Sequence, residues 1–261
     1  MKTPLNREEL QDVIDMSLWA GQMLLQNGAE SQRVEETVHR LGTGLGCDWM
    51  DVLVSPNVLI VTTTSGTEFR TKVRRVVGMG VDMSVITVIN TISHKVADGE
   101  MDRFAVRAKL ESVDTMNSHY NRWLVIVMVG LACAAFSRLF GGDTPTFFAT
   151  FGASAAAMFT HQTLTRNFFN PYLVIITTAF VSGVIASLAK VLGFLEDPAT
   201  ALAASVLLLV PGVPLINAAE DLIKGHNVTG IARALIGGLI AMAIALGLLM
   251  AITITGVTGG L

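Results

Sequence analysis

The feature that most limits how this chain can fold is a series of long apolar segments in its second half. A helix needs about 20 mainly apolar residues to cross the hydrocarbon core of a bilayer. Five segments after Arg122 approach that length, at about residues 123–140, 144–162, 171–192, 199–217 and 232–255. They predict an α-helical integral membrane protein with about five transmembrane helices, because uncharged runs this long are hard to cover with protein alone.

The second segment is the weakest of the five, because it is rich in Ala, Thr and Ser, and we expect it to pack inside the helix bundle. Small residues lie one helical turn apart at Gly130 and Ala134 and again at Gly183 and Ser187. That spacing is typical of helices that approach each other closely in a membrane.

The first 121 residues have a different composition. Only 15% of the chain is charged, whereas a soluble domain usually carries nearer 25%, and 13 of the 18 Lys and Arg lie at or before Arg122. The N-terminal sequence MKTPLNREELQD lacks the pattern of a signal peptide. We therefore expect a small cytoplasmic α+β domain over residues 1–121 and a transmembrane domain over residues 122–261.

The apolar periodicity predicts the elements of the first domain. Helices are expected up to about residue 28 and over 29–45, followed by an extended segment over 52–64 that Pro56 interrupts or places at a sheet edge. A tight turn over 64–67 leads into a second strand over 68–77. Two further helices, over 84–97 and 101–116, complete the order α-α-β-β-α-α.

The orientation follows from the basic residues, which favour the cytoplasmic side. The loops themselves differ little, with Arg166, Lys224 and Arg233 predicted inside and Arg138 and Lys190 outside. The 13 Lys and Arg that lie at or before Arg122 therefore decide the orientation, and five spans place the C-terminus outside.

Several functions find no support in the sequence. There is no basic stripe that would follow a nucleic-acid backbone. Cys47 and Cys133 lie in different halves, and His39, Cys47 and His94 have no metal-ligand spacing, so no disulfide, metal site or cofactor is expected. An enzyme would need convergent titratable groups in the first half, and the sequence offers no catalytic residues of that kind.

The most informative stretch lies at the end of the fourth apolar segment, where Ser205 precedes Pro211, Gly212 and Pro214. Proline removes a backbone donor and clashes with the preceding helical turn. Such breaks persist in membranes where protein or a water-filled cavity surrounds them, and transporters use them to expose backbone dipoles to a substrate. A simple kink at a helix end is an equally good reading of the pattern.

Polar residues follow directly. Asn217, Asp221 and Lys224 share one helical face and could line the inner mouth of a pathway, although a solvated loop suits Glu220 and Lys224 better. Arg166 and Arg233 could neutralise an anionic substrate, whereas Arg138 is better placed to reach lipid headgroups. The candidate pathway residues are therefore Ser205, Pro211, Gly212, Pro214, Asn217, Asp221, Arg166 and Arg233.

Three motifs together resemble the threonine/serine exporter family. They are Gly28-Ala29-Glu30 with Arg33-Val34-Glu35, Val81-Asp82-Met83, and Pro211-Gly212-Val213-Pro214 with Asn217 and Asp221. Full-length members of that family carry a cytoplasmic domain and about ten spans, twice the number expected here. The resemblance therefore implies the large subunit of the split form, whose partner is a small membrane subunit of four or five spans. Higher oligomers could also form.

Within the family, residues 203–217, Lys224-Gly225-His226 and the start of the first span are most similar to the large subunit of two-component succinate exporters. The resemblance implies a secondary exporter of small polar metabolites in the bacterial inner membrane. It favours dicarboxylates such as succinate over threonine and serine. No nucleotide-binding motif is present, so an ion or substrate gradient would supply the energy, with Asp221 as a candidate for proton coupling. A membrane-anchored enzyme and a scaffold are the lower alternatives.

Overall fold

A computed structural model describes residues 4–78, 80–114, 120–167, 169–195 and 198–257. The chain forms two compact units, and neither is continuous in sequence. Unit 1 contains Met1–Ser118 and Gly212–Leu235, and unit 2 contains His119–Pro211 and Ile236–Leu261. A segment from the second half of the chain therefore folds together with the N-terminal elements. The cytoplasmic location expected for residues 1–121 stays a prediction.

The described residues in the N-terminal part of unit 1 form four helices and three strands. Its elements are α1 (Arg7–Gln26), α2 (Ser31–Gly44), β1 (Trp49–Ser55), β2 (Val58–Ser65), β3 (Glu68–Arg75), α3 (Met83–Ala97) and α4 (Arg103–Asp114). A capping box starts α1, because the Asn6 side chain accepts from the backbone of Glu9 and the Glu9 side chain accepts from the backbone of Asn6. The four predicted helices are confirmed to within a few residues.

The sheet has the antiparallel order β1-β2-β3. The prediction of one interrupted strand over 52–64 was wrong, because Ser55 pairs with Val58 and Pro56-Asn57 form a two-residue turn between two strands. The fixed φ of proline suits the first central position of such a turn, so Pro56 ends a strand here. The predicted turn at 64–67 is confirmed, with Gly66 at φ 57°.

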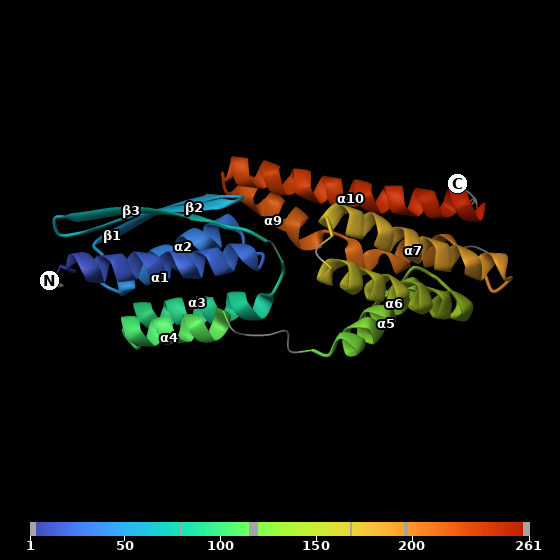
Figure 1. Cartoon of the computed structure of the whole chain (residues 1–261), viewed down its shortest axis with the longest axis horizontal. Helices are drawn as coiled ribbons and strands as arrows, with labels where there is room; N and C mark the ends of the chain where they lie inside the picture. Colours follow the sequence, from blue (N-terminus) through green and yellow to red (C-terminus); the bar gives the residue numbers. More distant parts are fainter. Residues whose placement is uncertain (1–3, 79, 115–119, 168, 196–197, 258–261) are drawn as a thin grey trace. The chain divides into compact units, whose positions relative to one another are not determined.

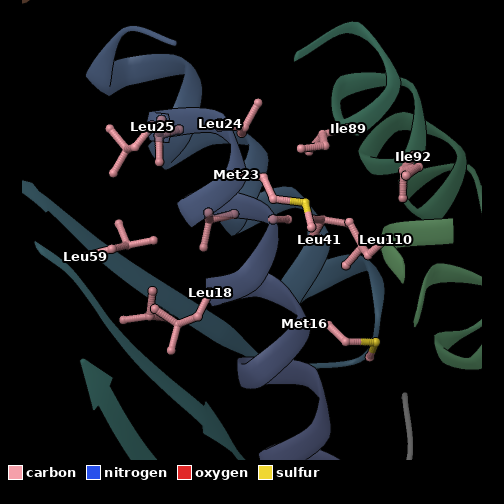
Figure 2. Packing of buried hydrophobic residues seen from close by; sticks show 14 of the residues in the cluster. Met16, Leu18, Met23, Leu24, Leu25, Leu41, Leu59, Ile89, Ile92 and Leu110 are labelled. Atoms are coloured by element: carbon pink, nitrogen blue, oxygen red, sulfur yellow. The ribbon is translucent and has the colours of Figure 1, made fainter. Parts of the chain in front are cut away.

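The core of this part lies around α1. Alternate residues of β2, including Leu59 and Val61, are buried, so one face of the sheet covers the helices. The three layers are the sheet, the α1–α2 pair and the α3–α4 pair (Figure 1). Leu18 and Leu25 of α1 lie on the side of Leu59, while Met23 gathers with Leu41 and Leu110 (Figure 2). The α1 side chains therefore join the sheet to the other helices.

Most of the apolar segments form helices. Unit 2 contains α5 (Arg122–Leu139), α6 (Thr144–Arg166), α7 (Pro171–Val191), α8 (Ala199–Ser205) and the 3₁₀ helix η1 (Leu207–Leu209). They are followed by α9 (Gly212–Ile223) in unit 1 and by α10 (Asn227–Thr255), which begins in unit 1 and ends in unit 2.

Small residues allow the helices of unit 2 to approach closely. A Cβ atom at Gly130 would lie 3.1 Å from the ring of Phe151 on α6. A Cβ at Gly183 of α7 would lie 2.7 Å from Cβ of Ala251 on α10. The close contacts expected at Gly130 and Gly183 are therefore present, and larger side chains there would separate these helix pairs.

Among the described residues, three helices, α5, α7 and α10, are long and apolar enough to cross a membrane, and the α8–α9 pair makes a fourth if the two pieces form one broken span. Helix α6 has 23 residues, which is long enough, but it is less apolar than these helices and is not among the candidate spans. A fifth span therefore stays a prediction. Large apolar side chains such as Leu124 and Met128 of α5 and Leu246 and Leu249 of α10 are about half exposed, as expected of surfaces that contact lipid or another membrane subunit.

Candidate functional site at the broken helix

The chain breaks between α8 and α9. Helix α8 ends at Ser205, the short η1 follows, and Val210 takes an extended conformation with φ −60° and ψ 124°. The proline that follows explains this conformation, because the ring of Pro211 clashes with a helical residue before it. The break therefore separates α8 and η1 from α9. Pro214 lies in the first turn of α9, where its missing N–H leaves no hydrogen bond unmade.

Directly after the break, α9 and the start of α10 bind the loop between α1 and α2. The Asn217 side chain donates to the Gly28 carbonyl at 2.7 Å, and Arg233 Nη2 donates to the Ala29 carbonyl at 2.8 Å. The Ser31 backbone N–H donates to Asp221 Oδ1 at 2.9 Å. We call these six residues, Gly28, Ala29, Ser31, Asn217, Asp221 and Arg233, the latch.

Asp221 also serves as the N-terminal cap of α2. The Glu30 side chain, at the N-cap position, makes no capping hydrogen bond, and Asp221 from another helix accepts from Ser31 instead. A carboxylate at this position satisfies a backbone donor and interacts favourably with the helix dipole. The start of α2 therefore depends on a residue of α9.

The latch contains a buried ion pair. Asp221 is fully buried and Arg233 is only 8% exposed, and their closest charged atoms, Oδ2 and Nη1, are 2.9 Å apart. The Nη1–H bond does not point at the carboxylate well enough for a hydrogen bond, so this contact is ionic. Removing one partner of such a pair leaves the other charge buried and unpaired. The pair therefore makes the latch sensitive to the loss of either residue.

The loop conformation requires Gly28. Its φ is 90°, and a Cβ atom there would lie 3.3 Å from the Gly80 carbonyl and 3.5 Å from the Val213 side chain. The Gly80 N–H in turn donates to the Gln26 carbonyl at 2.7 Å. A side chain at position 28 would be strained by its backbone conformation and crowded by its neighbours.

Charged residues surround the latch. Arg33 pairs with Glu30 one helical turn before it, because Arg33 Nε lies 3.0 Å from both carboxylate oxygens of Glu30. Burial acts to raise the pKa of Glu30, but the Arg33 hydrogen bond, backbone hydrogen bonding and nearby cations outweigh it and lower the pKa. Burial raises the pKa of Glu35 despite the opposing effect of His226, whose Nδ1 lies 3.6 Å from Oε1 of Glu35.

The structure brings together some of the predicted pathway residues. Asn217, Asp221 and Arg233 meet in the latch, and Pro211, Gly212 and Pro214 form the break and the start of α9. Ser205 ends α8 in unit 2, where its hydroxyl donates to the Leu202 carbonyl at 3.1 Å. Arg166 is exposed at the end of α6, and no ion pair in the described part of the chain includes it.

The sequence reasoning missed the partners of these residues. It noted Gly28-Ala29-Glu30 as a motif but did not connect the loop to α9 or α10. It also missed three buried hydroxyls of α7, on Thr178, Ser182 and Ser187, which have no hydrogen-bond partner in the part of the chain that the structure describes. Among the described residues, no group of three His, Cys, Asp or Glu side chains could hold a metal ion.

Comparison with known proteins identifies the family. Residues 15–255 match the threonine/serine exporter family, ThrE. The chain belongs to this family. Family membership confirms the resemblance seen in the motifs and indicates a transporter rather than an enzyme. Residues of the latch and of the break, from Gly28 to Arg233, all lie within the matched range.

Two relatives of this exporter are similar over nearly the whole length of both chains. The chain is 38% identical to the "Probable succinate transporter subunit YjjP" of Klebsiella aerogenes over 255 residues, covering 97% of this chain and 98% of the relative. It is 38% identical to the protein of the same name from Escherichia coli K12, covering 98% and 99%. An uncharacterized protein of Haemophilus influenzae is 35% identical over 121 residues, covering 46% and 40%. No solved structure matches the chain.

Proposed function

We propose that this chain is the large subunit of a two-component secondary exporter in the bacterial inner membrane, and that it exports small dicarboxylates such as succinate. The names of the two full-length relatives support both the assignment as a subunit and the substrate. The N-terminal domain would face the cytoplasm and the C-terminus the outside. The chain and its partner would draw on an ion or substrate gradient.

The observation that carries the proposal is the broken helix with its adjoining polar latch. Transporters bind substrates at discontinuous helices, whose free ends present backbone dipoles within the membrane. Here Pro211 separates two helical pieces, and Asn217, Asp221 and Arg233 follow within the next two helices. A pathway beside this break would bring the substrate to Gly212 and the start of α9.

The latch gives these polar residues a defined part in transport. Asn217, Asp221 and Arg233 all bind the loop before α2, so their first role is to hold α9 and α10 against that loop. We expect substrate to contact the backbone at the break, while the latch fixes the helix that follows. Arg166, exposed at the end of α6, would neutralise an approaching anion.

A small membrane partner would complete the transporter. Several large apolar side chains of α5 and α10 are about half exposed, and the relatives are named as subunits. A partner of four or five spans would cover part of this surface. Export of threonine or serine is the second candidate, because it is the activity for which the family is named.

The test is efflux of labelled succinate and threonine from bacteria that express the chain with its partner and from bacteria that express neither. We expect faster succinate efflux from the expressing cells, and a Pro211→Ala variant that assembles normally but loses most of that efflux. Faster efflux of threonine alone would favour the second candidate. Equal efflux of both solutes from both strains would refute the exporter, and normal flux through Pro211→Ala would support a scaffold.

A further inference from the structure

A polar cavity of about 280 Å³ lies in unit 1, beside the latch but outside it. Arg33 and Arg40 of α2, Asn90 and His94 of α3, and Lys224 from the turn after α9 contribute to its walls. All the side chains that line it are polar. Apolar side chains usually dominate the lining of a small-molecule pocket, so this one suits a strongly hydrated, charged ligand.

The charges of the cavity favour an anion. Three permanent cations, Arg33, Arg40 and Lys224, line the cavity with two carboxylates, Glu30 and Glu36, and a third carboxylate, Glu220, pairs with Lys224. Both carboxylates are already engaged, Glu30 by Arg33 at 3.0 Å and Glu36 by the Gln32 side chain at 2.6 Å. An incoming ammonium group would therefore compete for a carboxylate that is already engaged, whereas an incoming carboxylate would find Arg40, which has only neutral partners.

Two of the cations can be recruited by a ligand. Arg40 donates to Ser93 Oγ and to His94 Nε2, both at 3.0 Å, and forms no ion pair within the described residues. These two contacts leave most of its five donors available. Lys224 pairs with Glu220 across a partly exposed contact of the kind that contributes little to stability. A ligand carboxylate could replace that contact at small cost.

The neutral groups complete the site. Because arginine can only donate, Nε2 of His94 accepts the Arg40 hydrogen bond, which places the histidine proton on Nδ1. The Asn90 amide lies one helical turn before His94 on the same face of α3. Both residues can donate to an oxygen, so the cavity offers neutral donors as well as cations.

We propose that this cavity binds a small dicarboxylate, with Arg40 and Lys224 holding its two ends and Asn90 and His94 donating to its oxygens. The choice of a dicarboxylate rests on the proposed function, while the preference for an anion rests on the cavity alone. Because Arg40 lies on α2 and Lys224 lies three residues after Asp221, a bound dianion would connect α2 to the end of α9, as the hydrogen bond from Ser31 to Asp221 does. Binding would therefore stabilise unit 1.

The test is succinate binding to the purified full-length chain, measured by titration calorimetry and by thermal unfolding, with threonine and sodium sulfate at matched ionic strength as comparison solutes. We expect succinate to raise the unfolding temperature more than either. Arg40→Gln and Lys224→Gln should each weaken succinate binding at least tenfold. Arg75→Gln, which removes an exposed cation of β3 outside the cavity, should leave binding unchanged.

Lys224 is exposed, so Lys224→Gln should fold even if Arg40→Gln does not. Unchanged succinate binding in Lys224→Gln would overturn the proposal, and so would an equal effect of sulfate. Measurement of efflux in the same variants separates this site from the proposed function. Succinate efflux by the unaltered pair without succinate binding in the cavity would refute the site and leave the exporter standing. Succinate binding in the cavity without succinate efflux would support the site and refute the exporter.

Discussion

Asp221 of α9 accepts a hydrogen bond from the backbone N–H of Ser31, the first residue of α2, across 190 positions of sequence. The contact gives a helix of the N-terminal domain a cap that its own neighbourhood lacks. It also makes a carboxylate beside the proposed pathway part of the structure of the domain. The stability of the domain and the position of α9 should therefore change together.

Replacement of Asp221 by Asn should strongly destabilise unit 1, because it leaves the Arg233 guanidinium buried without a counter-charge. The expected loss is about 3–5 kcal/mol, visible as a lower midpoint in thermal unfolding of the purified protein. The matched control is Glu220→Gln, at the position next to Asp221. It breaks an exposed pair with Lys224 and should cost less than about 1 kcal/mol. Equal shifts in the two variants would contradict the buried-pair account.

Removal of both charges should be tolerated better than removal of one. In an Asp221→Asn/Arg233→Met variant no charge remains buried in the latch, although the Arg233 bond to the Ala29 carbonyl is lost. We expect an unfolding midpoint above that of Asp221→Asn alone, because the unpaired charge accounts for much of the single-variant loss. A midpoint at or below the single variant would show that the hydrogen bonds, rather than the charges, dominate the latch.

Gly28→Ala should loosen the loop before α2. Alanine at a positive φ costs about 1–2 kcal/mol, and here its Cβ would also meet the Gly80 carbonyl. Gly78→Ala is the matched control, because Gly78 has a φ of 78° with nothing within 4 Å of its Cβ position. Hydrogen exchange at the Ser31 amide should quicken in Gly28→Ala and not in Gly78→Ala. Similar exchange in both would argue against crowding at position 28.

Glu35→Gln should stabilise the protein at neutral pH. The pKa of Glu35 is raised above its ordinary value of 4.5, first by burial and then by Asp51, Asp221 and Glu36, against the opposing effect of His226. A raised carboxyl pKa contributes stability below pH 4.5 that is lost as the pH rises through the folded-state pKa. Unfolding midpoints measured from pH 4 to pH 8 should therefore favour Glu35→Gln only at the upper end. A difference in unfolding midpoint between Glu35→Gln and the unaltered protein that stays constant from pH 4 to pH 8 would refute the raised pKa of Glu35.

Because α7 and α10 approach closely, substitution by alanine should destabilise the protein at one glycine of α10 and be tolerated at another. A Cβ at Gly247 would collide with the Ile176 carbonyl and lie 2.7 Å from the Ala179 Cβ, whereas a Cβ at Gly238 would meet nothing within 4 Å. Gly247→Ala should cost about 1–3 kcal/mol through overpacking, and Gly238→Ala should be neutral or stabilising by up to about 1 kcal/mol. Thermal unfolding in detergent distinguishes them, and equal midpoints would count against this packing.

Local patterns predicted most of the elements of the N-terminal domain. The apolar period located its four helices, and Gly66 marked its second hairpin. Pro56 was misread because a proline within an apolar run fits both an edge strand and a turn, and only the pairing of Ser55 with Val58 distinguishes them. Apolar length likewise predicted the long helices of unit 2, while the break before Pro211 followed from the chemistry of proline.

The latch could not be predicted in the same way. Asn217 and Asp221 were recognised as candidates because polar residues beside an apolar span need a reason, but the pattern did not name their partners. Those partners are backbone atoms of Gly28 and Ser31, and backbone atoms carry no sequence signal. Long-range pairing of a carboxylate with a helix N-terminus depends on tertiary structure, which spacing along one chain does not reveal.

The interruption of unit 1 in the sequence matters for anyone who wishes to isolate its parts. A polypeptide ending at residue 121 would lack α9 and the start of α10, and with them Asp221 and Arg233. The carbonyls of Gly28 and Ala29 would lose their donors, and α2 would lose its cap. The N-terminal region is thus better expressed together with residues 212–235, as a two-piece complementation system, than as an excised domain.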